Sequence, residues 1–351
     1  MKNVNPFSLE FGVEPHECIE RLAEINEIKE DFTSIIPSTH FYAILGPRGC
    51  GKSVLLSSIV DSFSSMEGWI AIGLNCKDNM LEQFAAKLYD QAKMQSHFVA
   101  TEFSFSFSGL TFSIRGKEPV ASLSVLLEKM LKTLDRHNQK ILLYADDIAN
   151  NDYVATFAKE FQSLRMKKAP IFFLTTGLYS TFNNLQTSDG LTFLQRARKI
   201  YLTPLNYKAI ADSYADIFDI SFDQAKSLTL LTKGYAFAYQ CLGYLLVKEG
   251  ETSASTNILR KYDYYLSEYV YSKLFLDLTE KERNIAYYLA INGDSDNTKL
   301  IEAGLVSDKT ISVYKESLSK KGVLDVSTRG MNKLALPRFG EFVKFRMESF
   351  D

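Results

Sequence analysis

Gly46-Pro-Arg-Gly-Cys-Gly-Lys-Ser53 fits the pattern G-x-x-x-x-G-K-[ST] and directly follows the apolar run 41–45. Glycines in this pattern let backbone N–H groups curl around a phosphate, so the stretch predicts a nucleotide-binding loop. A strand is expected at 41–45 and a helix at 54–63, whose positive N-terminal end would face the phosphates. This order of strand, loop and helix suits ATP or GTP with Mg²⁺. An ordinary glycine-rich turn is the alternative.

The positions of this loop have separate expected roles. Lys52 is expected to span the β- and γ-phosphates, and the Ser53 hydroxyl is suited to Mg²⁺. Cys50 is either sensitive to oxidation, because Lys52 and a helix N-terminus favour the thiolate, or simply a small residue at a variable position. The predicted nucleotide-binding residues are Gly46, Pro47, Arg48, Gly49, Cys50, Gly51, Lys52, Ser53 and Val54.

The composition is that of a soluble globular protein. The chain has 351 residues, 46% of them hydrophobic, and a formal net charge of −2, which suggests two or three domains and no general affinity for nucleic acid. Residues 1–10 do not resemble a signal peptide, and no apolar run is long enough to span a membrane, so a cytoplasmic protein without a membrane partner is expected. Four scattered cysteines and four histidines argue against a zinc site or a disulfide framework.

Strand and helix patterns alternate from about residue 40 to 205, after an amphipathic helix expected at 15–32. Several strands are apolar throughout, as in a sheet that helices cover on both faces. The pattern therefore predicts an α/β fold with a doubly wound parallel sheet. Further strands are expected at 69–74, 140–145, 170–176 and 199–202, and helices at 80–94 and 120–134. Residues 102–115 predict a β-hairpin with one apolar face, which either covers a helix of its own domain or serves as a partner-binding flap.

Two acids, Asp146 and Asp147, end the apolar strand at 140–145. In a phosphate-loop protein such acids lie near the metal, so Asp146 is the predicted Mg²⁺ residue and Asp147 the acid that polarises the attacking water. Glu is more usual at the second position, so slow turnover, or almost none, is considered. The alternative is a pair of acids on a solvated loop.

Three further side chains are candidates for the chemistry. Thr175, or its neighbour Thr176, ends the next strand, where it could sense the γ-phosphate or cap the following helix. Arg196 and Arg198 could offset the charge that develops in the transition state, or could be solvated.

The carboxyl-terminal half is expected to be largely helical. Helical patterns run from 207 to 249, and the pattern from 278 suits a winged helix-turn-helix, with Ser307-Asp308 as the N-cap of its third helix. Residues 278–351 contain 12 Lys+Arg and 11 Asp+Glu, a weak positive charge for DNA binding, so contact with DNA and a packing role both stay open. The predicted DNA-binding residues are Lys309, Ser312, Lys315 and Arg329, with Lys320, Lys321 and Lys333 nearby.

Together these motifs resemble the AAA+ ATPases of the origin-recognition type and their relatives in the STAND class, and more closely a set of bacterial ATP-binding proteins of this group. The resemblance covers nearly the whole chain. It rests on the loop and on the stretches 142–147, 174–178, 192–198 and 232–240.

By this resemblance Lys52, Ser53 and Asp146 would hold nucleotide and Mg²⁺. The resemblance also makes Asp147 the catalytic acid, Thr175 the sensor and Arg196 the arginine at the γ-phosphate. The chain departs from the group in two places: Asp147 replaces Glu, and Gly234-Tyr235-Ala236 stands where relatives have a sensor arginine or a proline.

The resulting prediction is a P-loop ATPase core at 1–205, a helical lid at 206–277 and a winged helix-turn-helix domain at 278–351. We expect a switch in which ATP and Mg²⁺ reposition the winged helix toward duplex DNA or a protein partner, and slow hydrolysis to ADP resets it. A homo-oligomer is also considered. The alternatives are a non-hydrolysing nucleotide-binding scaffold whose winged helix contacts protein, and a small-molecule kinase.

Overall fold

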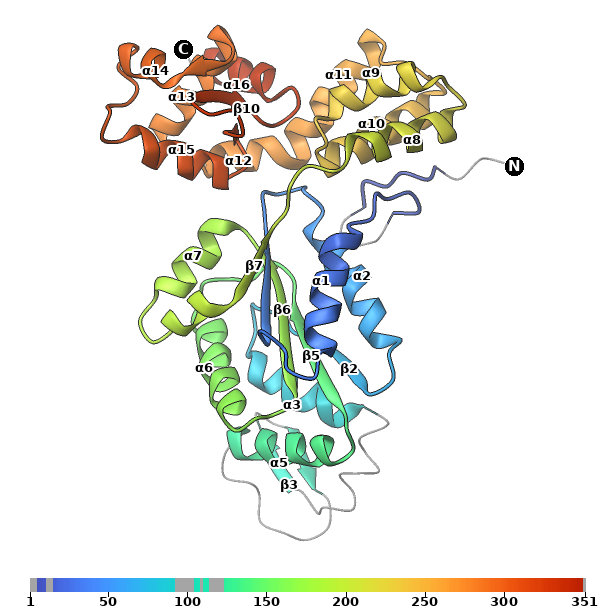
Figure 1. Ribbon diagram of the computed structural model, residues 1–351, viewed down its shortest axis with the longest axis vertical. Helices are drawn as coiled ribbons and strands as arrows, with labels where there is room; N and C mark the ends of the chain where they lie inside the picture. The colour runs from blue at the N-terminus through green and yellow to red at the C-terminus, as the bar shows by residue number, and fades with distance from the viewer. Residues whose placement is uncertain (1–4, 11–14, 92–103, 108–109, 114–122, 350–351) are drawn as a thin grey trace. The chain divides into compact units, whose positions relative to one another are not determined.

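The computed structural model describes residues 5–10, 15–91, 104–107, 110–113 and 123–349, and the chain divides into two compact units (Figure 1). The sheet unit comprises Arg21–Leu45 and Leu55–Ile200. The helical unit comprises Met1–Glu20, Gly46–Val54 and Tyr201–Asp351. The loop at 46–53 thus groups with the carboxyl-terminal half of the chain, while the three predicted domains stay a prediction.

The sheet unit is built on five strands in the order β2-β5-β6-β1-β7. The strands β1, β2, β5 and β6 pair in parallel, with Phe41 opposite Phe173 and Ile141 opposite Ile171. The predicted doubly wound α/β fold is confirmed. The strand bounds are β1 Phe41–Leu45, β2 Trp69–Gly73, β5 Lys140–Ala145, β6 Ile171–Gly177 and β7 Arg198–Tyr201.

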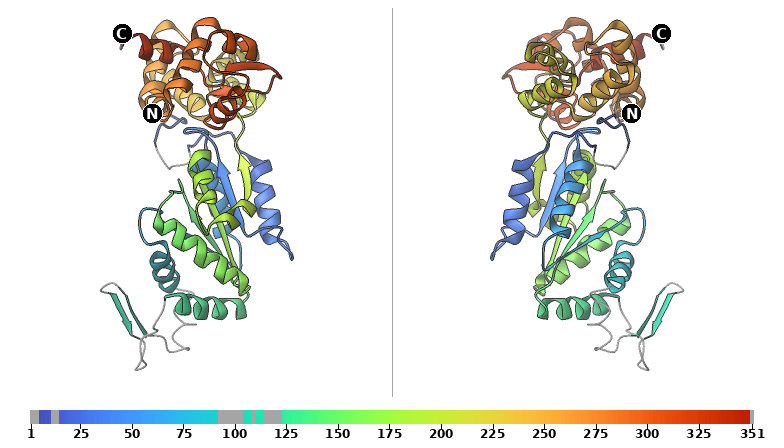
Figure 2. Two further views of the ribbon diagram at one scale, coloured as in Figure 1. Left: turned by 90° about the vertical axis from the view of Figure 1, so that its left-hand side faces the viewer. Right: turned by 90° about the vertical axis from the view of Figure 1, so that its right-hand side faces the viewer.

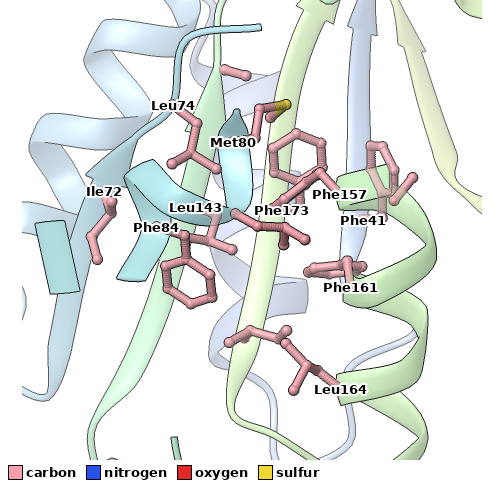
Figure 3. Packing of buried hydrophobic residues seen from close by; sticks show 14 of the residues in the cluster. Phe41, Ile72, Leu74, Met80, Phe84, Leu143, Phe157, Phe161, Leu164 and Phe173 are labelled. Carbon is pink, nitrogen blue, oxygen red and sulfur yellow. The ribbon is translucent and has the colours of Figure 1, made fainter. Parts of the chain in front are cut away.

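One face of this sheet carries a core rich in phenylalanine (Figure 3). Phe41 and Phe173, neighbours in the sheet, lie 4.8 Å apart between ring centroids, and Phe173 lies 4.9 Å from Phe157 of α6. Helices on this face hold the buried apolar side chains because their apolar positions repeat at helical spacing. The helices are α3 Met80–Asp90, α5 Leu123–Arg136, α6 Asp152–Met166 and α7 Tyr179–Thr187.

The opposite face of the sheet is covered by α1 (Leu22–Thr33) and α2 (Lys52–Ser64), so helices lie on both faces (Figure 2). Phe32 of α1 packs against Tyr42 and Phe172, at 5.3 Å and 4.8 Å between ring centroids. These strand residues alternate with Phe41 and Phe173, because successive side chains of a strand point to opposite faces. The apolar run in each strand therefore supplies two separate cores.

Two predictions in this unit need adjustment. The helix expected at 15–32 begins only at Leu22, because residues before it bind elsewhere: the Glu17 carbonyl accepts a hydrogen bond from Gln240 Nε2 at 2.6 Å, within the helical unit. The predicted hairpin is present as β3 (Ser104–Phe107) and β4 (Leu110–Ser113), which pair antiparallel. Its turn and flanks lie outside the described residues, so its role as a partner-binding flap stays a prediction.

The helical unit contains the expected all-helical segment after residue 206. Polar N-caps start several of its helices, for example Asn206 before α8 and Ser221 before α9, where each side chain accepts a backbone N–H. Phe7 of the N-terminal segment is 2% exposed and packs on Gly243 of α10. The helix bounds are α8 Tyr207–Phe218, α9 Phe222–Thr232, α10 Ala236–Glu249 and α11 Thr256–Leu266, followed by a π-helical turn at Ser267–Tyr271 and α12 Ser272–Leu276.

The last part of the chain was expected to contain three helices followed by two strands, and the structure adds a short strand between the first two helices. A further helix, α16 (Phe339–Glu348), which was not predicted from the sequence, packs against Tyr271 through Phe339 at 5.1 Å between ring centroids. The other elements are α13 Glu280–Asn292, β8 Ser295–Asp296, α14 Asn297–Glu302, α15 Ile311–Lys320, β9 Leu324–Asp325 and β10 Met331–Leu334. The three strands form a small antiparallel sheet in the order β8-β10-β9.

The predicted N-cap at Ser307-Asp308 is wrong. The Ser307 N–H donates to Thr310 Oγ1 at 3.0 Å, and the Ser307 carbonyl accepts the N–H groups of Thr310 and Ile311 at 2.9 Å. These groups form a separate turn at residues 307–310, so α15 begins at Ile311, three residues later than an N-cap at Ser307-Asp308 would place it. Among the described residues, every helix is too short or too polar to cross a bilayer.

Replacing Phe173 by alanine is expected to lower the free energy of unfolding by about 3–5 kcal/mol, because the ring is 1% exposed and its loss leaves a cavity between β1 and α6. Urea unfolding followed by circular dichroism measures the change. Met166→Ala, at a side chain 80% exposed on α6, is the matched control and should stay within about 0.5 kcal/mol. Equal effects of the two substitutions would contradict this account of the core.

Candidate functional site: a phosphate loop and an acidic strand edge

The loop at Gly46–Ser53 has the backbone that phosphate binding requires. Gly49 and Gly51 have φ of 73° and 95°, a region that residues with a Cβ rarely adopt, and α2 starts at Lys52. Lys52 Nζ donates to the carbonyls of Gly46 and Pro47 at 3.0 and 2.7 Å. Its ammonium group therefore lies against the loop, whose helix-side N–H groups form an anion-binding end.

Cys50 is 6% exposed, and a Cβ built on Gly46 would stand 2.6 Å from its Sγ. Of the two interpretations of Cys50, burial favours that of a small residue that fills the base of the loop. Reaction with an oxidant needs an accessible thiolate, and such access is lacking here.

The start of α10 holds the other side of the loop. The Tyr235 hydroxyl donates to the Arg48 carbonyl, and the Phe237 N–H donates to the Gly49 carbonyl at 2.9 Å. Gly49 has no room for a side chain here, because an added Cβ would overlap the Tyr235 hydroxyl. In the sequence, Gly234-Tyr235-Ala236 is visible only as a departure from the pattern of the group, and no local signal predicts these contacts.

The same loop also touches the segment around α12 and the carboxyl-terminal module of the helical unit. A Cβ added to Gly322, which follows α15, would lie 2.6 Å from Pro47, so the two residues are packed closely. Arg48 Nε lies 4.0 Å from Asp277 Oδ2, a separation of charges too long for a hydrogen bond. Three successive loop residues thus contact three different segments.

In the sheet unit, Asp146 and Asp147 directly follow β5, and both are exposed. Thr176 of β6 binds both: its Oγ1 donates to Asp146 Oδ1 and accepts the Asp147 N–H at 2.8 Å. Asp147 has φ of 53°, in the left-handed region, so the chain turns sharply at this residue. Thr176 therefore orients both acids.

Thr175, the predicted sensor, faces a different partner. It is fully buried, and its Oγ1 donates to the Ala145 carbonyl at 2.8 Å. Adjacent strand residues point to opposite faces, so one of the two threonines contacts the acid side chain and the other the neighbouring backbone. The sensor role of Thr175 stays a prediction, whereas Thr176 is the threonine in contact with Asp146.

The strand order explains why these residues gather at one edge. β6 lies between β1 and β5, and Leu45 stands opposite Gly177 while Ala145 stands opposite Thr175. Parallel strands end at the same edge of a sheet, so the strand that leads into the loop and the strand that carries the acids end on either side of β6.

The two arginines proposed for the transition state have different surroundings. Arg198 is committed to the sheet unit, because its guanidinium pairs with Glu27 of α1 at 3.1 Å and lies 5.8 Å from the Tyr42 ring. Arg196 ends the 3-10 helix Thr192–Arg196, and its side chain is exposed. Arg198 is exposed as well, but its guanidinium is already engaged in this ion pair.

The predicted DNA-binding residues differ in exposure, and their role stays a prediction. Lys309, Ser312 and Arg329 are exposed, but Lys309 lies in the turn before α15. Lys315 Nζ donates to Asn297 Oδ1 at 3.0 Å and is half-buried. Other lysines of the module pair with its own acids: Lys321 with Glu282 at 2.7 Å, Lys333 with Asp294 at 3.6 Å, and Lys320 with Glu316.

Comparison with solved structures finds other proteins of similar fold. The chain resembles the Walker-type ATPase of Pyrococcus abyssi with a TM-score of 0.67 and 13% identity, over 96% of this chain and 99% of that one. It also resembles the ORC2 protein of Aeropyrum pernix, solved as ADPNP–ADP complexes (TM-score 0.48, 15% identity, 97% of both chains), and Cdc6p of Pyrobaculum aerophilum (0.47, 15%, 97% of both). Neither protein-family models nor curated protein sequences match the chain.

At this identity the likeness to the Pyrococcus protein shows a shared fold. A phosphate-loop α/β core with a helical carboxyl-terminal region is the fold of this chain.

Thr176→Val is expected to destabilise the protein by about 1–3 kcal/mol, because the Asp147 N–H and the Asp146 carboxylate each lose a hydrogen bond. Thr175→Val is the matched control on the same strand, and it removes only a donor to a backbone carbonyl. Its expected cost is about 1 kcal/mol. Guanidinium unfolding of both variants tests this difference, and a larger loss for Thr175→Val would contradict the assignment.

Proposed function

We propose that this protein is an AAA+-type molecular switch that binds ATP with Mg²⁺ and hydrolyses it slowly. The observation that carries the proposal is the loop itself, with left-handed glycines at 49 and 51 and Lys52 folded against its carbonyls. A loop of this form presents backbone N–H groups and a cation to phosphate oxygens. The fold shared with a Walker-type ATPase supports it.

The residues present suit Mg²⁺. Asp146 and Ser53 offer hard oxygen donors, and a magnesium site in a phosphate-loop protein needs only one or two protein oxygens besides phosphates and water. Within the described ranges no cluster of three or more His, Cys, Asp or Glu suggests a different metal. Bound Mg²⁺ would neutralise charge on the β- and γ-phosphates, while Thr176 fixes the orientation of Asp146.

In this proposal Asp147 polarises the attacking water and Arg196 offsets charge on the transferred phosphoryl group. Asp147 is exposed and one methylene shorter than Glu, and its left-handed backbone fixes where its carboxylate can reach. A short acid held on a sharp turn supports slow turnover, since general base catalysis depends on reach to the water. Thr175 is retained as the proposed γ-phosphate sensor.

The contacts of the loop support the switch. Pro47 packs on Gly322 in the proposed winged-helix domain, and Arg48 faces Asp277 before it. A ligand that rearranges the loop would change these contacts, and a ligand shifts a conformational equilibrium only through such differential contacts. We infer that nucleotide controls whether the winged helix is free to engage a partner.

Duplex DNA is one candidate partner and a protein is the other. Exposed Lys309, Ser312 and Arg329 favour DNA. The ion pairs of Lys320, Lys321 and Lys333 with acids of the same module favour protein, because a paired lysine contributes less to phosphate binding.

Lys52→Ala is expected to abolish ATP and ADP binding, because the ammonium that neutralises the phosphates is lost. Isothermal titration of wild type and variant measures this, with Lys77→Ala, at an exposed lysine of the sheet unit, as the control. Wild-type ATP affinity in Lys52→Ala would show that the loop does not bind nucleotide.

Asp147→Asn is expected to keep nucleotide affinity within about twofold but to lower steady-state phosphate release at least tenfold, because an amide cannot accept the proton of water. A coupled ATPase assay with Mg²⁺ follows the change. If the wild type releases no phosphate with or without duplex DNA, the non-hydrolysing scaffold replaces the switch.

Lys309→Ala combined with Arg329→Ala distinguishes the partners. For a DNA-binding module, the double substitution should weaken binding of a labelled duplex and reduce the salt dependence of its affinity by about two counterions. Fluorescence anisotropy in ATP and in ADP measures both quantities. Equal duplex affinity of the wild type and the variant would assign the module to a protein partner.

A further inference from the structure

Helix α10 lacks the usual side-chain cap at its start. Asn206, Ser221, Ser255 and Thr279 cap α8, α9, α11 and α13 through a side-chain oxygen that accepts a backbone N–H. At α10 the capping position holds Tyr235, whose side chain makes no such bond. The Tyr235 hydroxyl instead donates a hydrogen bond to the Arg48 carbonyl.

The nucleotide-binding loop supplies the missing cap. The first N–H groups of a helix have no partner within it, and here the Phe237 N–H donates to the Gly49 carbonyl at 2.9 Å. Helix and loop therefore satisfy each other: the loop gives the helix an acceptor, and the helix gives the loop two donors. Neither surface would be complete without the other.

The donor is held firmly in place. Tyr235 is 7% exposed, and burial raises the pKa of its phenol well above the usual value, so the hydroxyl keeps its proton. Gly234 before it has φ of 68° and its carbonyl accepts the Leu205 N–H at 2.8 Å, which fixes the approach to α10. Ala236 Cβ stands 3.5 Å from a Cβ built on Gly51, so α10 also packs on the far end of the loop.

The direction of these two carbonyls decides where the loop amides point. In a trans peptide the C=O and the following N–H lie in one plane and point in opposite directions. When the Arg48 and Gly49 carbonyls turn toward α10, the N–H groups of Gly49 and Cys50 turn away from it. Those are the amides that a loop of this type directs at the β-phosphate.

We propose that Tyr235 is a positioning residue for the nucleotide: its hydroxyl holds the Gly49 amide in the orientation that binds the β-phosphate, while the Phe237 N–H of the same helix start holds the Cys50 amide. The inference rests on the proposed function and adds to it a direct connection between phosphate and lid. A phosphate that orders the loop also orders the first turn of α10, because the same two hydrogen bonds serve both. The residue acts on ADP and ATP alike, since both contain the β-phosphate.

Tyr235→Phe tests the proposal by removing one hydroxyl while leaving the ring. Loss of a hydrogen bond that orients the loop should weaken the affinity for ADP and for ATP by the same factor, about five- to tenfold. The dependence of nucleotide affinity on Mg²⁺ should not change. Isothermal titration of full-length protein with each nucleotide measures both constants. Steady-state assays should show a raised KM with kcat retained, because ground and transition states lose the same contact.

Tyr214→Phe is the matched control. Tyr214 is buried like Tyr235, and its hydroxyl also donates to a backbone carbonyl, that of Tyr239 at 2.8 Å, outside the loop. It should lose stability as Tyr235→Phe does and keep nucleotide affinity. Thermal unfolding without nucleotide checks that both variants are folded at the temperature of titration.

Three outcomes would contradict the proposal or its basis. Equal ADP affinity in Tyr235→Phe, Tyr214→Phe and wild type would make Tyr235 a structural residue only. Weakened ATP affinity with unchanged ADP affinity in Tyr235→Phe would mean that Tyr235 acts on the γ-phosphate rather than on the loop. Failure of the wild type itself to bind either nucleotide would instead overturn the proposed function, so the two failures are distinguishable.

Discussion

The backbone carbonyls of the loop at residues 46–53 need hydrogen-bond donors, and the rest of the helical unit is arranged around that need. A loop that turns its N–H groups inward for phosphate turns its carbonyls outward, where leaving them unpaired would be costly. Lys52 donates hydrogen bonds to the carbonyls of Gly46 and Pro47, and the start of α10 donates to the carbonyls of Arg48 and Gly49. The N–H side of the loop, proposed to bind phosphate, and the carbonyl side, which packs on Lys52 and α10, therefore belong to the same stretch of backbone.

The two acids at the end of β5 are likewise held by hydrogen bonds from a neighbouring segment. Two carboxylates that follow a buried strand would repel each other and move freely without a local partner. Thr176, from the strand beside β5, donates to one acid and accepts the backbone N–H of the other, so a single hydroxyl orders both residues. A hydroxyl can do so because it is donor and acceptor at once. Its position between β1 and β5 comes from the strand order.

Several charged side chains of the carboxyl-terminal module pair with one another. Glu282 is 2% exposed and receives hydrogen bonds from Lys321 Nζ and Ser317 Oγ at 2.7 and 2.6 Å, which keep the pKa of its carboxyl below the usual value despite burial. A buried carboxylate requires such partners. The lysine at the end of α15 thus stabilises the join between α13 and α15, and a count of charges alone would have credited it to a binding surface.

The sequence by itself determined the loop, the two acids and the alternation of strand and helix, because glycine conformation, strand-ending acids and hydrophobic periodicity are local properties. It did not determine the late start of α15 after Thr310 or the contact of Thr176 with Asp146, which depend on competing turns and strand neighbours. Tyr235 and Arg48 are 187 residues apart, so no local pattern connects them. Only the tertiary structure could decide that contact, because a hydrogen bond forms between groups that packing brings together, whatever their separation along the chain.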